Sequence, residues 1–181
     1  MNNVIDGTEA SRGLRNNVKK EIVRKKITPS LTVIQIGDNK ASDIYVRNKK
    51  KACEEVGIKF ELLKFNDTIS QDVVINEIKR LNDDVMVNGI LVQLPLPIGF
   101  DEGLIINSIN PVKDVDGLTY QNVGNLVLEN DCLAPCTPLG VMELLDMYNV
   151  NLSKKNVCLI GRSNLVGKPL IPASYTHLRA H

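Results

Sequence analysis

The sequence predicts an α/β fold built on a mostly parallel sheet. Short β-branched segments alternate with longer segments of helical periodicity, which is typical of strands joined by crossover helices. The apolar run GILVQL at residues 89–94 is nearly continuous and indicates a strand buried on both faces. Near the end of the chain, a strand-like segment runs into Gly161 and a helical segment follows, which is the layout of a strand, turn and helix unit.

The first expected elements are a helix, a strand and a second helix. The apolar positions of the first helix recur every fourth residue, at Leu14, Val18 and Ile22. This helix is expected to end before Thr28-Pro29. Residues 30–36 (SLTVIQI) form the first strand, and residues 42–56 form a helix that stops at Gly57, a natural C-cap.

The alternation then continues with a strand, a helix and a strand. Residues 59–65 form the second strand. Ser70 caps a helix whose apolar face consists of Val74, Ile78 and Leu81. Residues 89–94 form the third strand.

The rest of the chain is expected to begin with an irregular, loop-rich stretch over residues 95–135, and such long loops are often functional. Thr137-Pro138 then provides an N-cap and a first helical position. Residues 156–160 (NVCLI) form a strand, and a helix is expected from Leu165 onward.

The overall charge is almost neutral, because 22 Lys and Arg oppose 21 Asp and Glu for a formal net charge of +1. This balance argues against nucleic-acid and anionic-membrane partners. The two histidines, His177 and His181, stand at the end of the chain, which excludes Ser-His-Asp triads and His-rich metal sites from its body. Scattered cysteines, without a secretory or membrane-length apolar run, predict a cytoplasmic protein.

Lys49 is the only charged residue on the apolar face of the predicted helix 42–56. It either extends its amine to solvent or lies in a partly desolvated cleft, where a lysine has a lowered pKa and can act as a base. Tyr45 lies one turn earlier on the same face. Its ring either packs in the core or offers a stacking surface beside the amine.

Gln93 is a lone amide in the apolar third strand. A buried amide needs partners, so it either satisfies neighbouring backbone groups or points from the strand end toward a ligand. Pro95 and Pro97 forbid further strand pairing, so Gln93 lies near the carboxyl end of the strand, where open parallel sheets bind ligands. This position favours a functional role.

Two carboxylates, Asp114 and Asp116, stand in the turn-like segment KDVDGL. They are either solvated turn residues, or one of them accepts paired N–H donors from a heterocycle. The residues alone do not choose between these alternatives. Cys132 and Cys136 have no further Cys or His nearby, so we expect no metal site.

The segment GRSNLVGKP at residues 161–169 has the layout of a phosphate-binding turn at a helix N-terminus. It matches neither G-x-G-x-x-G nor a Walker A loop. Arg162 and Ser163 are suited to an extra phosphate, as an adenosine 2′-phosphate requires.

Five successive motifs coincide with one known family. They are IGDNKASDIYVRNKKKACEEVGI, GILVQLPLP, INPVKDVDGL, PCTPLGVMELL and GRSNLVGKPL. In order and spacing, over nearly all of residues 4–170, they resemble the bifunctional methylenetetrahydrofolate dehydrogenase/methenyltetrahydrofolate cyclohydrolase family (FolD type). The resemblance implies a usually homodimeric protein with an N-terminal three-layer α/β catalytic lobe, a Rossmann-type NADP-binding lobe and folate in the cleft between them.

The resemblance also implies roles for individual residues. Lys49 falls at the catalytic lysine, Gln93 at the glutamine beside it and Asp116 at the catalytic-site aspartate that holds the pterin. The implied folate-binding residues are Tyr45, Lys49, Val92, Gln93, Leu94 and Asp116. The implied NADP-binding residues are Gly161, Arg162 and Ser163, which favour NADP, with NAD as the alternative, and no metal is implied.

The implied reaction begins when hydride leaves the bridging methylene of the folate for the nicotinamide and gives a methenyl cation. Water adds to that cation, and Lys49 manages the protons as the ring opens to formyl-tetrahydrofolate. A different Rossmann-linked dehydrogenase, acting on an amino or hydroxy acid, fits the combination of Tyr45, Lys49 and Gln93 less well.

Four segments are expected: a catalytic domain (1–136), a linking helix and connection (137–155), the start of an NADP-binding domain (156–170) and a foreign tail (171–181). A doubly wound domain needs more elements than these positions supply. The tail lacks the pattern of the apolar helix expected after the turn, and its end, SYTHLRAH, resembles a translated transposase-type sequencing adapter. The alternative to an enzyme is therefore a non-catalytic fragment that binds folate weakly at most and exposes the strand 156–160 to aggregation.

Overall fold

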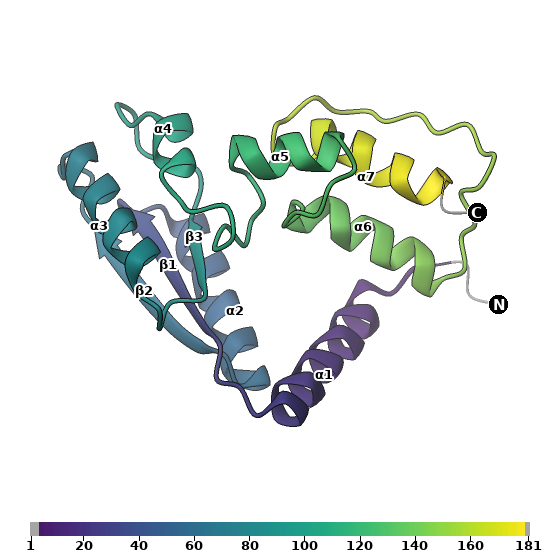
Figure 1. Ribbon diagram of the computed structural model, residues 1–181, viewed down its shortest axis with the longest axis horizontal. Coiled ribbons are helices and arrows are strands. Elements are labelled where there is room, and N and C mark those ends of the chain that lie inside the picture. Colours follow the sequence, from purple (N-terminus) through teal and green to yellow (C-terminus); the bar gives the residue numbers. More distant parts are fainter. Residues whose placement is uncertain (1–3, 180–181) are drawn as a thin grey trace. The chain divides into compact units, whose positions relative to one another are not determined.

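The computed structural model describes residues 4–179, with side chains up to residue 174. The chain divides into two compact units (Figure 1). The sheet unit contains residues 13–114, and the helical unit combines the residues before position 13 with those from position 115 onward. This division differs from the boundary expected at residue 136, because helix α5 (Tyr120–Val127) packs against a helix near the end of the chain.

The sheet unit is built on three parallel strands in the order β2-β1-β3, which confirms the predicted parallel sheet. The strands are β1 (Ser30–Ile36), β2 (Lys59–Phe65) and β3 (Gly89–Val92). β3 ends two residues earlier than expected. The backbone N–H of Gln93 still donates to the Ile34 carbonyl at 2.8 Å, but Pro95 has no N–H with which to continue the ladder.

Helices cover both faces of this sheet, so the sheet unit has the three layers that the resemblance implies (Figure 1). α2 (Lys40–Val56) lies on one face and α3 (Gln71–Asp83) on the other. α1 (Gly7–Lys25) precedes β1, and the short α4 (Glu102–Asn107) packs against α3.

Capping residues set the ends of α2 and α3. The Asn39 side chain accepts hydrogen bonds from the first-turn N–H groups of α2, so this helix starts slightly before its expected position. Gly57 ends α2 with φ +91°, a left-handed conformation that costs glycine little. Ser70 caps α3 by accepting from the Val73 N–H, as predicted.

The main core of the sheet unit lies between the sheet and α3. The predicted apolar stripe of α3 is fully buried there, with Val74, Ile78 and Leu81 each at 0% exposure. Their partners from the sheet include Ile34, Ile36, Ile90 and Val92. Since strand residues alternate between faces, the intervening residues of β1 and β3 face α2.

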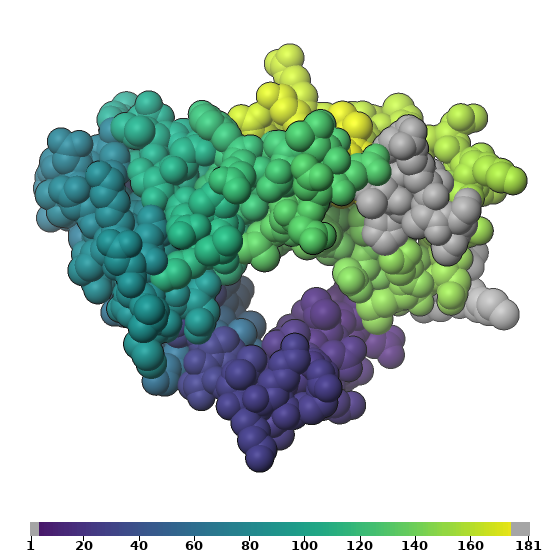
Figure 2. All heavy atoms as spheres, in the orientation of Figure 1, coloured from purple at the N-terminus to yellow at the C-terminus, as the bar shows by residue number. Residues whose placement is uncertain are grey.

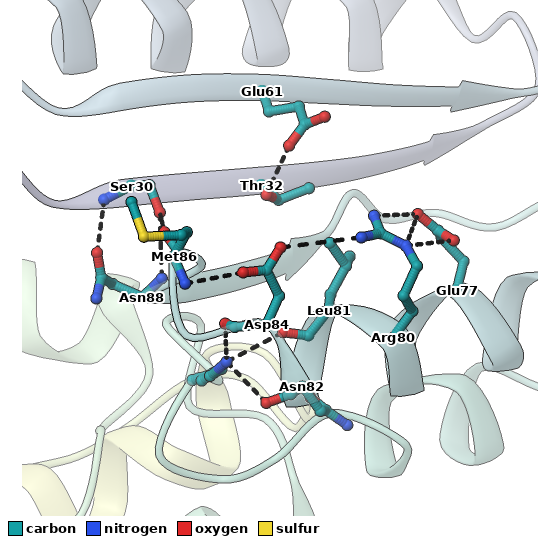
Figure 3. Close-up of polar contacts among 11 residues, drawn as sticks. Ser30, Thr32, Glu61, Glu77, Arg80, Leu81, Asn82, Asp84, Met86 and Asn88 are labelled. Carbon is teal, nitrogen blue, oxygen red and sulfur yellow. Dashed lines mark hydrogen bonds and ion pairs between the residues drawn. The ribbon is translucent and has the colours of Figure 1, made fainter.

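Polar contacts surround the C-terminal end of α3 and join it to the segment that follows α4 (Figure 3). The Lys113 ammonium donates to the carbonyls of Leu81, Asn82 and Asp84 at 2.7–3.0 Å, which satisfies acceptors that a helix end leaves unpaired. The carbonyl of Lys113 accepts from the Ile90 N–H at 2.7 Å. The segment that enters the DVDG sequence is therefore held by both α3 and β3.

The helical unit contains α5, α6 (Cys136–Met147) and α7 (Gly167–Arg179), and α7 packs against the other two. Two expectations are corrected here. The stretch 95–135 is not irregular throughout, because it contains α4 and α5. Thr137 is not the N-cap of α6: the helix starts at Cys136, two residues earlier than expected, and its N-cap Pro135 makes no side-chain cap hydrogen bond.

The strand predicted at residues 156–160 is wrong, because these residues form no strand in the structure. A strand requires a neighbour for its backbone hydrogen bonds, and Ile160 instead is 99% exposed. The expected helix after the turn is present as α7. It also continues into the segment 171–179, where no helix was expected, and buries Ala173 and Ser174.

The remaining residues of the expected tail, including His181, lie outside the described residues, as does the side chain of His177. Within residues 4–179, no helix has both the length and the apolar character needed to cross a membrane.

Candidate active site

Lys49 and Gln93 meet on the α2 face of the sheet. The Lys49 ammonium donates to Gln93 Oε1 at 2.9 Å, and Gln93 Nε2 donates to the Leu94 carbonyl at 2.7 Å. The second bond fixes the amide with its oxygen toward the lysine. Lys49 is half-buried, and its amine is held by Gln93 instead of extending freely into solvent.

Tyr45 lies one turn before Lys49, and the residue is 62% exposed. The core-packing alternative for this residue is therefore wrong. An exposed aromatic ring beside a held amine offers a surface on which a planar heterocycle can stack.

Val92 and Leu94 flank Gln93 but differ in environment. Val92 is 4% exposed and its side chain belongs to the core on the α3 side. The Val92 side chain therefore points away from the face that carries Gln93 and α2. Leu94 is half-buried, and its carbonyl holds the Gln93 amide.

Three polar side chains form a row across the sheet next to α2, and this row was not expected from the sequence. In the β1–β2 register, Gln35 is paired with Lys64. In the β1–β3 register, Ile34 is paired with Val92, so the next residues of the two strands, Gln35 and Gln93, lie side by side. We call Lys64, Gln35 and Gln93 the polar row. Gln35 is a lone amide in the buried segment SLTVIQI, the same signal that singled out Gln93 in its own strand.

The polar row is bonded to α2 at two points. Lys49 reaches Gln93 at one of them. At the other, Gln35 Nε2 donates to Asp43 Oδ1 at 2.7 Å, and the Lys64 ammonium lies 3.4 Å from the same oxygen. The hydrogen bond from Gln35 is the main cause of a lowered pKa at Asp43, with Lys64 adding to it.

Lys64 and Cys53 complete the electrostatics of this face. The pKa of Lys64 is raised, chiefly by its hydrogen bond to Asp38 at 2.7 Å. Burial raises the pKa of the Cys53 thiol, while the nearby Lys49 charge opposes that effect. Cys53 is therefore a neutral, small core residue near pH 7, whereas Cys136 and Cys158 are exposed.

Asp114 and Asp116 have different surroundings. Asp114 is 1% exposed and forms a parallel bridge with Ile90, so its backbone extends the sheet. Asp116 is half-buried in the helical unit and is the more accessible carboxylate. Gly117 follows it with φ +65°, and a Cβ at that position would overlap the backbone of Leu133.

The turn from Gly161 to Gly167 is compact and requires glycine at its end. A Cβ on Gly167 would lie 2.5 Å from the carbonyl carbon of Gly161. Ser163 Oγ accepts from the Val166 and Gly167 N–H groups at 3.1 and 3.3 Å, and Arg162 is exposed. Close backbone packing at the start of a helix of 13 residues, with an exposed guanidinium beside it, fits a phosphate-bearing cofactor.

The described part of the chain contains no group of three or more His, Cys, Asp or Glu residues arranged to hold a metal ion. Cys136 donates its thiol hydrogen to the Val115 carbonyl at 3.2 Å, and Cys132 has a pKa raised by burial and then by Asp131.

A hollow of about 480 Å³ lies along α1 and is lined by Asn16, Lys19, Lys20, Val23 and Arg24. None of the predicted site residues lines it. Much of α1 is exposed, and Figure 2 shows its side chains, in purple, at the surface.

Two family models match the chain. The tetrahydrofolate dehydrogenase/cyclohydrolase catalytic domain matches residues 5–116, and the NAD(P)-binding domain of the same enzymes matches residues 135–175. The first match alone covers more than half of the chain. The chain belongs to the tetrahydrofolate dehydrogenase/cyclohydrolase family.

Relatives and solved structures agree with this membership. The chain is 46% identical over 170 residues to the bifunctional protein FolD of Bacillus cytotoxicus, covering 92% of this chain and 59% of that protein. The FolD crystal structure from Campylobacter jejuni superposes with a TM-score of 0.92 at 43% identity, covering 96% of this chain and 63% of that one. The Trypanosoma brucei enzyme, solved with NADP and an inhibitor, gives a TM-score of 0.90 at 32% identity over 96% and 61%.

The two matched ranges include every folate-binding and NADP-binding residue that the resemblance implied. Lys49, Gln93 and Asp116 lie within the catalytic-domain match, and Gly161 lies within the NAD(P)-binding match. The second match extends five residues beyond position 170, where the cofactor lobe was expected to stop. The chain spans about three fifths of the length of the relatives it matches.

Proposed function

We propose that the protein to which this chain belongs oxidises methylene-tetrahydrofolate to methenyl-tetrahydrofolate with NADP and then hydrolyses the product to formyl-tetrahydrofolate. The observation that carries the proposal is the 2.9 Å hydrogen bond between Lys49 and Gln93 beside the exposed ring of Tyr45. An oriented amine next to a stacking surface provides proton transfer at a bound heterocycle.

Each residue of the proposed site has a separate task. Gln93 Oε1 holds the Lys49 amine in place, and Lys49 exchanges protons with water as that water adds to the folate and the ring opens. Tyr45 stacks on the folate, and the backbone of Val92 and Leu94 borders it. The Asp116 carboxylate accepts hydrogen bonds from the pterin N–H groups.

NADP supplies the acceptor for the hydride when it is bound. We propose that Gly161, Arg162 and Ser163 hold it: the two glycines of the turn allow close backbone approach, and the exposed Arg162 is available to a 2′-phosphate. The same turn without a contact from Arg162 would serve NAD.

The proposal extends to the setting of the enzyme. A folate substrate, a homodimer and a cytoplasmic location accord with family membership and with the nearly neutral charge. The neutral charge also supports the absence of nucleic-acid and membrane partners.

The second candidate is a non-catalytic fragment that binds folate weakly at most. The observation in its favour is segment 156–160, which forms no strand and exposes Val157 and Ile160. The two candidates separate when the 181-residue chain is mixed with NADP and methylene-tetrahydrofolate. We expect no reduction of NADP by this chain and turnover by the complete protein.

The role of Lys49 is tested in the complete protein with Lys49→Met. We expect at least a hundredfold loss of cyclohydrolase kcat, since general acid-base catalysis typically contributes about 10²–10⁴-fold. Lys50→Met is the matched control, because Lys50 is exposed on the same helix and is expected to be replaceable without loss. Unchanged cyclohydrolase turnover in Lys49→Met would contradict the proposal.

A further inference from the structure

The polar row connects to α2 at two residues that lie six positions apart. Asp43 in the first turn binds Gln35, and Lys49 binds Gln93. With a rise of about 1.5 Å per residue, these attachments are separated by roughly 9 Å along the helix axis. Two polar attachments at that spacing add to the apolar packing of α2, whose Val46, Cys53 and Val56 are buried, and orient its N-terminal half on the sheet.

Burying the Gln35 amide costs folding free energy that an apolar side chain at this position would not cost. It is 2% exposed, and its carbonyl oxygen is buried without a hydrogen-bond partner in the described part of the chain. An apolar side chain of the same length would avoid the desolvation of that oxygen. The benefit of the amide lies instead in its Nε2, which donates to Asp43 at 2.7 Å.

The Asp43 carboxylate is contacted by side chains from two strands. The Lys64 ammonium lies 3.4 Å from the oxygen that Gln35 also binds, and Lys64 is itself paired with Asp38 at 2.7 Å. The carboxylate is therefore oriented by two strands, β1 and β2, before α2 reaches Lys49. Within the described residues, Gln35 bonds to Asp43 and Lys49 bonds to Gln93, so any influence of Gln35 on Lys49 passes through the helix.

We infer that Gln35 is a positioning residue: through Asp43 it seats α2 on the sheet so that the Lys49 amine meets Gln93. This inference rests on the proposed function of Lys49 for its catalytic meaning, but the positioning itself is independent of any activity. It predicts that loss of the Gln35 amide releases the Lys49 amine from Gln93 without unfolding the protein.

The test measures the reactivity of the Lys49 amine in the 181-residue chain. Trace acetylation with acetic anhydride at fixed pH, followed by peptide mass spectrometry, gives the rate at Lys49 relative to exposed Lys51 on the same helix. In Gln35→Met we expect this ratio to rise at least threefold, with a melting temperature at or near that of the unmodified chain. Asp43→Leu should act in the same way.

Two variants separate positioning from general damage. Asp43→Asn keeps an oxygen that can accept from Gln35, and its ratio should stay within twofold of the starting value. Thr32→Val removes a buried polar group from the same strand but on the opposite face, where Thr32 faces Glu61, and should leave the ratio unchanged. A ratio that stays within twofold in both Gln35→Met and Asp43→Leu would overturn the inference.

The same substitution in the complete enzyme connects positioning to catalysis. Gln35→Met should lower cyclohydrolase kcat about tenfold and leave KM within twofold, because the amine is displaced while the folate surface remains. If the acetylation ratio rises but the unsubstituted enzyme has no cyclohydrolase activity, the proposed function fails and the positioning role stands. If the unsubstituted enzyme is active and the ratio does not change, the positioning role fails alone.

Discussion

Replacing Gly117 by alanine should destabilise the helical unit more than any ordinary surface substitution. Gly117 has φ +65°, a conformation that costs an L-residue roughly 1–2 kcal/mol. The added Cβ would also overlap the backbone around Leu133, Ala134 and Pro135, which has no flexible side chain to move aside. Strain and overlap together should reduce the free energy of unfolding by about 3 kcal/mol or more.

Thermal unfolding followed by circular dichroism provides the measurement. A loss of 1 kcal/mol lowers the midpoint by roughly 4–8 °C in a unit of 60–100 residues, so about 3 kcal/mol should lower it by at least about 12 °C. Gly124→Ala is the matched control, because Gly124 lies within α5 and has nothing within 4 Å of its Cβ position. Alanine there should stabilise the protein by about 0.5–1 kcal/mol.

A Gly117→Ala protein that melts with the unsubstituted chain would refute this reasoning. It would mean that the segment carrying Asp116 moves away from residues 133–135 at little cost. The local conformation of the turn would then not be what holds Asp116 in place. A midpoint lowered equally by Gly124→Ala would show instead that alanine at any glycine of this unit is disruptive.

Two further predictions concern α2. Asp43→Asn should make the free energy of unfolding depend less on pH in the acid range. The pKa of Asp43 is lower in the folded protein than its ordinary value of 3.8. The Asp43 carboxylate therefore stabilises the folded protein above that value, and this stabilisation is lost as the pH falls through the lower folded pKa. Urea unfolding at a series of pH values checks this, and equal acid sensitivity in both proteins would contradict it. Tyr45→Leu should weaken folate binding about two- to twelvefold in equilibrium titrations, since aromatic stacking contributes roughly 0.5–1.5 kcal/mol. Tyr120→Leu, at a tyrosine that is also exposed, should leave folate binding unchanged.

The pattern of apolar residues was sufficient to predict most of the sheet unit. Val74, Ile78 and Leu81 recur at helical spacing and are fully buried, and Ser70 and Gly57 mark the helix ends where they were expected. These are local signals: each depends on residues within one or two turns of itself.

The errors arose where structure depends on distant partners. The segment 156–160 has a strand-like composition, but β structure requires a neighbouring strand, and none pairs with it within the described residues. α4 and α5 were missed because they are short, with 6 and 8 residues, and are stabilised by contacts from outside their own sequence. α7 continues past Pro172, and its contacts with α5 and α6 again come from outside its own sequence.

Some residues of the candidate site could likewise be identified from their neighbours in sequence, and others only from the folded structure. Lys49 stands out as a charge on an apolar face, and Gln93 as an amide in an apolar strand, so each was identified by contrast with its immediate neighbours. Asp114 and Asp116 could not be ranked in that way. The structure separates them because Asp114 pairs with Ile90, a residue 24 positions away in sequence.

By itself, the sequence determined the element types of the sheet unit, the anomalous residues Lys49 and Gln93, and the family, because these follow from composition, periodicity and motif spacing. Only the tertiary structure decided which side chains are bonded to each other. The strand order β2-β1-β3 places Lys64, Gln35 and Gln93 in one row, although they are separated by 29 residues or more along the chain. Register between strands is a property of the folded sheet, and it is this register that gives Asp43 and Lys49 their partners.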